Sequence, residues 1–258
     1  MKLLFYFFFI LSLFWANSIF ADQKGVLLRV GAPEYYPLSF AGKDKTAQGF
    51  FVEYLKDLGK KEKWELTFEF GTREELLTRL EKGEIDLVLS VDYKAEFKER
   101  FTLTHERIVA DWGQVILRDG LSLDSILDLE GKVIAVNKDG PFYTEIYKFS
   151  DSLNHKPVIR YAESYEEIFE LVRSKQVDAG LITRVFAQSQ IKPLTLHRNA
   201  VSLSPTGVGF AFTKDKFEEI RKEIDEHLHE DKLDRKSIYH QLYKKWFPKR
   251  SAPLNPQM

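Results

Sequence analysis

An internal repeat constrains the fold of this chain more than any other feature of its sequence. Segment 72–90, TREELLTRLEKGEIDLVLS, recurs at a constant offset of 92 positions as segment 164–182, SYEEIFELVRSKQVDAGLI. A hydroxyl residue, paired glutamates, apolar positions and an aspartate fall in the same places in both copies. Chance agreement between two amphipathic helices is the alternative, but the match includes caps, helix length and strand position together. We therefore expect two similar structural units.

Each copy is predicted to be a helix that leads into a buried strand. Thr72 with Glu75, and Ser164 with Glu167, have the S/T-x-x-E spacing of a capping box, which satisfies N–H groups that a first helical turn leaves unpaired. The apolar positions then change from helical spacing to a short continuous run. Strands predicted at 66–70 and 157–161 complete a β-α-β unit in each half, which indicates two α/β lobes rather than one long sheet.

The first 21 residues have the order of a secretory signal peptide. A nearly continuous apolar stretch, 3–15, follows Lys2, and small or polar residues lead to Ala21, the expected cleavage position. An uncleaved membrane anchor is the alternative, although the apolar stretch is short for a span. The chain contains no cysteine, which excludes a bacterial-type lipid anchor, disulfides, thiolate metal sites and cysteine catalysis. We expect a periplasmic protein that begins at Asp22.

Length and charge limit the possible partners. Residues 22–258 exceed the usual size of a single core and suit two lobes. The 38 lysines and arginines nearly balance the 39 aspartates and glutamates, so the formal net charge is −1. This balance leaves no field that would draw the protein to nucleic acid or to an anionic membrane. We expect a monomer that binds a small molecule in a local site and has no nucleic-acid partner.

Two loops are predicted to follow strands at the edge of a cleft. Prolines in loop 31–40 exclude helix and would hold the rings of Tyr35, Tyr36 and Phe40, unless these rings close the lobe core instead. Loop 137–141 follows strand 132–136 in the same way. The helix that begins near Phe142 would aim its first N–H groups into the space between the lobes.

The remaining patterns complete the expected order of elements. Segment 91–100 is predicted to be a solvated, charged helix. A short helix is expected at 122–129, and two strands at 195–197 and 208–212 flank a crossing between lobes. An amphipathic helix is expected at 217–228, with Arg221 on the surface, and another at 238–247. The proline-rich tail from Pro248 is expected to be loose.

Seven motifs follow one another in a specific order along the chain. They are YYPLSF at 35–40, GF at 49–50, GEID at 83–86, GQV at 113–115, LDLEGKVIAV at 127–136, the unit 165–178 and YKKWF at 243–247. In this order they resemble the family 3 periplasmic solute-binding proteins, the amino-acid-type receptors of ABC importers. The resemblance implies a two-lobed, type II periplasmic-binding-protein-like α/β fold, with two mixed sheets flanked by helices. With the repeat, it predicts crossings near 110–114 and 204–208, lobe 1 from 22–111 and 208–258, and lobe 2 from 112–207.

The residues that bind α-amino acids in the family do not carry over to this chain. Ala95 stands where the family has an arginine that clamps the ligand carboxylate, and Thr183 where it has an aspartate for the ammonium group. In the family, a loop offers hydroxyl groups to the ligand carboxylate, and the corresponding segment of this chain ends at Pro141. An unpaired zwitterion in a closed cleft would be costly, so we expect a small polar ligand other than an ordinary α-amino acid.

A different set of residues is therefore predicted to bind the ligand. Arg73, in the first turn of the first repeat helix, is the cationic candidate; the alternative is an ion pair with Glu69 or Glu34. The candidates share positions at strand ends and helix starts facing the expected cleft. They are Glu34, Tyr35, Tyr36, Phe40, Arg73, Ser90, Asp92, Lys94, Asn137, Lys138 and Thr183.

The sequence offers little support for catalysis. Its six histidines form no H-E-x-x-H motif, and it has no G-x-S-x-G elbow or glycine-rich phosphate loop. We expect no cofactor and no metal, with an enzyme as the lesser alternative because a related fold occurs in cell-wall lytic enzymes. The main alternative to a receptor that serves an ABC permease is an exported sensor or interaction module with a degenerate cleft, docked on a membrane sensor.

Overall fold

The computed structural model describes residues 25–138, 140–151, 153, 156–189 and 197–248. The predicted signal peptide, residues 1–21, and the tail beyond residue 248 lie outside the described residues. The first half of the chain forms β1 (Leu27–Pro33), β2 (Phe40–Ala41), β3 (Ala47–Gln48), α2 (Phe50–Glu62), β4 (Glu65–Gly71), α3 (Arg73–Glu81), β5 (Leu87–Asp92), α4 (Ala95–Arg100), β6 (Thr102–Leu103) and β7 (Val109–Leu117). The second half forms the 3-10 turn η1 (Ile126–Leu129), β8 (Val133–Asn137), α5 (Tyr143–Asp151), β9 (Val158–Ala162), α6 (Tyr165–Arg173), β10 (Ala179–Thr183), α7 (Arg184–Ser189), β11 (His197–Phe212), α8 (Glu218–Leu233) and α9 (Ile238–Trp246).

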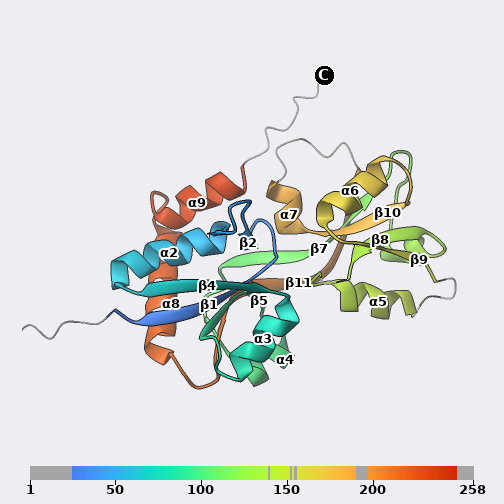
Figure 1. Cartoon of the computed structure of the whole chain (residues 1–258). Coiled ribbons are helices and arrows are strands. Elements are labelled where there is room, and N and C mark those ends of the chain that lie inside the picture. Colours follow the sequence, from blue (N-terminus) through green and yellow to red (C-terminus); the bar gives the residue numbers. More distant parts are fainter. Residues whose placement is uncertain (1–24, 139, 152, 154–155, 190–196, 249–258) are drawn as a thin grey trace, which may run out of the picture.

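A nine-stranded sheet runs through the molecule in the order β4-β1-β5-β11-β7-β10-β8-β9, with β6 paired to β11 beside this path. At one end β4 and β5 run parallel to β1, and at the other end β9 and β10 run parallel to β8. The central strands β7 and β11 are antiparallel to their neighbours. Figure 1 shows one α/β half on each side of these two strands.

The sheet is continuous where the sequence predicts two separate sheets. β11 passes without a break through the predicted crossing at 204–207, and its pairing with β7 extends from His197↔Leu117 to Val208↔Val109. Because both crossing segments are long strands that pair with one another, the hydrogen-bonded ladder passes from one half to the other. The predicted lobe boundaries, at 111/112 and 207/208, stay a prediction.

The internal repeat is reproduced at the same offset in three dimensions. Helices α3 and α6 begin at Arg73 and Tyr165, 92 positions apart, and strands β5 and β10 begin at Leu87 and Ala179, also 92 positions apart. The two strands of each β-α-β unit run parallel to one another, but they are not neighbours in the sheet. β1 lies between β4 and β5, and β8 lies between β9 and β10.

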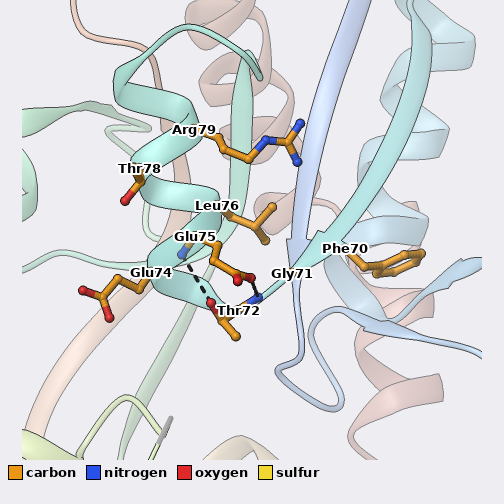
Figure 2. Close-up of a pocket in the computed structure, with 8 residues that line it drawn as sticks. All are labelled: Phe70, Gly71, Thr72, Glu74, Glu75, Leu76, Thr78 and Arg79. Atoms are coloured by element: carbon orange, nitrogen blue, oxygen red, sulfur yellow. Dashed lines mark hydrogen bonds between the residues drawn. The ribbon is translucent and has the colours of Figure 1, made fainter.

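The caps of the two repeat helices differ in one bond. In α3 the Thr72 Oγ1 accepts the Glu75 N–H at 3.3 Å, and the Glu75 carboxylate accepts the Thr72 N–H at 2.9 Å (Figure 2). In α6 the Ser164 Oγ accepts the Glu167 N–H at 3.1 Å, but the Glu167 carboxylate accepts the N–H of Glu163 instead. The second predicted capping box is therefore only half formed, because its carboxylate satisfies the residue before the cap.

Two local expectations near the ends of elements are wrong. The helix predicted at 122–129 is reduced to the 3-10 turn η1, and Arg221, expected on the surface, is only 3% exposed. Its guanidinium binds Glu218 and Asp225, which lie on the same face of α8. Two carboxylates within one turn on either side allow this arginine to be buried. The solvated helix predicted at 91–100 is confirmed only for α4, which has no buried residue, because Val91 and Asp92 end the buried strand β5.

Buried apolar side chains gather separately in the two halves. Two clusters draw almost entirely on residues before 110 and after 207, with Val185 of α7 as the exception. Two others consist of residues between 115 and 187. The apolar face of α3 packs into the first half through Leu76, Leu77 and Leu80, each of which is at most 5% exposed. Burial of a leucine side chain stabilises the fold by about 1.5–3 kcal/mol.

The cap of α3 gives a test of this local structure. Thr72→Ala removes the oxygen that accepts the Glu75 N–H, so the free energy of unfolding should fall by about 1 kcal/mol. Thr78→Ala is the matched control, because Thr78 is exposed within the same helix and alanine is the better helix former there. Urea unfolding of both variants measures the difference. Equal stabilities of the two variants would contradict the assigned cap.

Candidate ligand-binding site

A pocket of about 260 Å³ lies between the residues that end β1, β4 and β5 and the residues at the ends of β8 and β9. The carboxyl ends of strands are where ligands bind in α/β sheets. Both helices of the repeat begin at the wall of this pocket. It is lined by Pro33, Glu34, Tyr35, Gly71, Thr72, Arg73, Ser90, Asn137, Gly140, Pro141, Glu163 and Tyr165.

The two copies of the repeat contribute equivalent positions to the pocket. Gly71 and Arg73 come from the first copy, and Glu163 and Tyr165 stand 92 positions later. The first residues of α3 and α6 therefore line the same cavity from the two halves. Sequence reasoning selected Arg73 but missed Tyr165 and Glu163, although the constant offset was a signal that could have found both.

A buried carboxylate holds Arg73 in place. The Arg73 Nη2 donates to the Asp92 Oδ2 at 2.8 Å, and the two side chains are 19% and 1% exposed. The guanidinium also lies 5.3 Å from the centre of the Phe97 ring, close enough for a cation–π attraction. The expected alternative, a pair with Glu69, is wrong because Glu69 binds Arg79 at 2.5 Å. A ligand carboxylate would have to compete with Asp92 for Arg73.

Glu34 lines the pocket without pairing with Arg73. Its carboxylate accepts the N–H of Ala41 at 3.3 Å. Burial raises the pKa of Glu34, the Ala41 N–H opposes this shift, and the negative charge of Glu166 adds to it. The second half of the molecule therefore places negative potential near Glu34.

Ser90 lies in the wall in an unusual backbone conformation. Its φ of 61° is left-handed, which costs a residue other than glycine about 1–3 kcal/mol and is most often seen at functional sites. The Ser90 Oγ is 3.0 Å from the Oγ of Ser39, which donates to the Pro33 carbonyl at 2.8 Å. This chain of hydroxyls joins the end of β5 to the loop after β1, so the two walls are fixed together.

Tyr35 connects the pocket to the central strands. Its hydroxyl donates to the Asp111 Oδ2 at 2.5 Å, and Asp111 also accepts the N–H groups of Trp112 at 2.9 Å and Val185 at 3.1 Å. Burial, with a smaller contribution from the charge of Asp92, raises the pKa of Asp111 to about 7 against these hydrogen bonds. Tyr35 is thus anchored at its hydroxyl, and it is also one of the residues that line the pocket.

Lys94 links the two halves beside the pocket. It follows β5, and its Nζ donates to the Glu145 carboxylate and, at 3.3 Å, to the Pro141 carbonyl at the start of α5. Both ionised side chains are about three-quarters buried. Lys94 is therefore engaged by protein groups from the opposite half.

Tyr36 and Phe40 lie outside the pocket lining, in an aromatic cluster with the C-terminal helix. Their ring centres are 6.4 Å and 5.7 Å from that of Trp246, and Tyr36 is 6.1 Å from Phe186 of α7. All of these are edge-on or tilted contacts of the kind that stabilises aromatic cores. Tyr36 therefore contacts aromatic rings of both halves, whereas the ring contacts of Phe40 are with Tyr36 and Trp246.

Two further candidates also fall outside the lining. Thr183 is fully buried, and its Oγ1 accepts the Phe186 N–H at 3.1 Å, so it satisfies the first turn of α7. Lys138 is exposed. Asp139, in the loop that follows, lies outside the described residues. The pocket thus brings together Glu34, Tyr35, Arg73, Ser90 and Asn137 from the predicted set, with Asp92 behind Arg73.

Tyr165 is the main residue that sequence reasoning missed. Its ring centre is 5.1 Å from that of Phe186, and a Cβ on Gly140 would lie 3.2 Å from its hydroxyl. The loop after β8 therefore approaches Tyr165 closely because residue 140 has no side chain. Burial raises the pKa of Tyr165.

A larger hollow, of about 670 Å³, lies over the start of α3 (Figure 2). Three of the five polar side chains that line it are already engaged, since Thr72 and Glu75 form the capping box and Arg79 binds Glu69 and Glu84. The residues that line this hollow come from the first copy of the repeat and the end of β4 before it. We therefore place the candidate ligand site in the smaller pocket, which both halves build.

Within the part of the chain that the structure describes, no group of three or more histidine, aspartate or glutamate side chains is placed to hold a metal ion. No helix within the described ranges is long and apolar enough to cross a membrane.

Comparison with known proteins gives one family for nearly the whole chain. The model of the bacterial extracellular solute-binding proteins, family 3, matches residues 28–249. The chain is 27% identical over 238 residues to the Bacillus subtilis (strain 168) protein named probable amino-acid-binding protein YxeM, covering 90% of this chain and 87% of that protein.

Solved structures share the fold at lower sequence identity. The chain is similar to the crystal structure of Tv2483 bound to L-arginine, with a TM-score of 0.72, 18% identity and coverage of 95% and 98% of the two chains. It is also similar to a histidine kinase sensor domain with similarity to periplasmic binding proteins, with a TM-score of 0.69, 17% identity and coverage of 87% and 96%. These likenesses confirm the predicted α/β, periplasmic-binding-protein-like fold.

The buried carboxyl of Asp111 predicts a pH dependence of stability. Its pKa is about 7 in the folded protein and roughly 4 in an unfolded chain. Its contribution to stability is therefore fully present below about pH 4 and is lost as the pH rises through 7. The free energy of unfolding of the wild type, minus that of Asp111→Asn, should fall between pH 4 and pH 8 in urea titrations. A difference that stays constant or grows over this range would show that Asp111 is not buried as described.

Proposed function

The chain belongs to the bacterial extracellular solute-binding proteins of family 3, and from this premise we propose that it captures a small polar ligand in the pocket between its two halves for an ABC importer. Proteins of this family are solute-binding proteins of amino-acid ABC transport and are generally not enzymes. We further propose that this chain acts in the periplasm as a monomer, after removal of residues 1–21.

One observation carries the proposal: the pocket is built from equivalent positions of the two repeats. Arg73 begins α3 and Tyr165 begins α6, and both line one cavity. A ligand held there would contact both halves at once. Such a ligand would stabilise the arrangement in which the halves are close, since it adds contacts that neither half can make alone.

We propose that the ligand is not an ordinary α-amino acid. Arg73 is the one cation among the described residues of the lining, and Asp92 already binds it. The positions that carry the family's amino-acid-binding groups are used otherwise here. Ala95 has no charged group, and Thr183 caps α7. A carboxylate in the pocket would meet no unengaged guanidinium, so it would lose its hydration without full compensation.

The second candidate function is that of a sensor or interaction module with a degenerate cleft. The observation in its favour is that cleft groups bind one another, as in the Arg73–Asp92 pair and the contacts of Lys94 with Glu145 and Pro141. Such bonds hold the two halves together without a ligand. A membrane sensor would then be the partner in place of an ABC permease.

Identification of the bound ligand tests the proposed function. Protein purified without denaturation should carry a small molecule that native mass spectrometry detects and that is none of the twenty common amino acids. Titration of that molecule should show binding weakened roughly ten- to a hundredfold by Tyr165→Ala, because a ring of the wall is lost. Tyr147→Ala is the matched control, since Tyr147 is 53% exposed on α5. Equal affinities of the two variants for the ligand would contradict the assignment of this pocket as the ligand site. A protein that neither carries nor binds a small molecule would favour the second candidate function, a sensor or interaction module.

A further inference from the structure

The charges around the pocket indicate which class of ligand it selects, and this inference rests on the proposed function. The charged residues of the described lining are Glu34, Arg73 and Glu163. Asp92 compensates Arg73 through a hydrogen bond of 2.8 Å. The two glutamates then remain as an excess of negative charge, one from each half.

Arg73 is a poor partner for an anionic ligand. Asp92 is 1% exposed, and its Oδ1 has no hydrogen-bond partner among the residues that the structure describes. A ligand that took Arg73 away would leave this buried carboxylate without its counter-charge, which is a strongly destabilising arrangement. The pair therefore behaves as a fixed neutral wall, and the negative charge of Asp92 works against a second carboxylate nearby.

Lysines near the pocket do not offset this excess of negative charge. Lys94 is held by Glu145 and the Pro141 carbonyl, and Lys138 is exposed and outside the lining. On the acidic side, Glu166 is close enough to Glu34 for its charge to act on it. The pocket thus presents glutamates from both halves to a ligand and offers no unpaired cation from the described lining.

The uncharged walls suit an organic cation. Tyr35 and Tyr165 line the pocket from opposite halves, and tyrosine rings attract ammonium groups through their faces. The volume, about 260 Å³, lies slightly below the roughly 300 Å³ at which pockets for drug-sized ligands begin. Tyr35 is only 4% exposed, so a small ammonium compound would depend mainly on Tyr165 and the two carboxylates.

We propose that the pocket selects small organic ammonium compounds that carry no carboxylate, with Glu34 and Glu163 as the residues that determine this specificity. Each half supplies one carboxylate, so a cation between them would be bound only when both halves meet around it. An α-amino acid with the same ammonium group would add a carboxylate beside Asp92, and its affinity would be lower.

Matched ligand pairs that differ only by the carboxylate test this proposal. The mature chain, freed of ligand by unfolding and refolding, would be titrated by calorimetry with cadaverine against lysine and with agmatine against arginine. We expect at least one amine to bind tenfold or more tightly than its parent amino acid, and the amino acids to bind no tighter than about 10 μM. Glu34→Gln and Glu163→Gln should each weaken the amine tenfold, because each removes one charge from the pocket. Glu226→Gln, the same change at an exposed position on α8, should have no effect.

The outcomes separate this inference from the proposed function. An amino acid that binds as tightly as its amine, no measurable binding of either amine, or glutamine variants that bind the amine like the wild type would each overturn the ligand class. If the copurified ligand is neutral or anionic and Tyr165→Ala weakens its binding, the proposed ligand class is wrong but the proposed function holds. If Tyr165→Ala changes the binding of no ligand, both fail.

Discussion

The pairing of β7 with β11 is the constraint on which the rest of this structure depends. The two strands run antiparallel from His197↔Leu117 to Val208↔Val109 and join two α/β units into one hydrogen-bonded ladder. This pairing fixes where the carboxyl ends of β1 and β5 lie relative to that of β8. Asp111 on β7 strengthens the arrangement, because it accepts hydrogen bonds from the loop after β1 and from α7. The pocket is a consequence of this central pair.

Within that frame, the internal repeat explains why the site has two similar walls. Each copy starts a helix at the pocket, so each supplies its first residue to the lining. The two copies differ in chemistry at that position, with a guanidinium in one and a phenol in the other. Asp92 then removes the guanidinium from competition for anions. Besides this pair, the charged and aromatic residues of the described lining are Glu34, Glu163, Tyr35 and Tyr165.

Features set by neighbouring residues were predictable from the sequence, and features set by distant pairing were not. The starts of α3 and α6, and the presence of a buried strand after each helix, follow from capping residues and apolar spacing, which act over a few residues. The continuity of β11 was missed because segment 204–208 was interpreted as a crossing between two separate strands. Pro205 instead lies where the register shifts between Leu203 and Thr206, and a strand tolerates a missing N–H at such an irregularity.

In the candidate site, too, local features were predictable from the sequence and contacts between distant residues were not. Arg73, Ser90 and Asn137 were found because strand ends and helix starts can be located from local patterns. The partner of Arg73 was not found, since the sequence placed Glu69 and Glu34 equally within reach and only the end of β5 brings Asp92 to it. The assignment of Thr183 to the cleft took no account of its hydrogen bond to the Phe186 N–H. Tyr165 was accessible through the repeat offset, which was used for elements but not for individual side chains.

A crystal structure of the protein with its copurified ligand would test the central claim most directly. The account predicts electron density for one small molecule between Arg73 of α3 and Tyr165 of α6, with an ammonium group near Glu34 and Glu163. A ligand bound in the hollow over α3, or elsewhere outside this pocket, would contradict it.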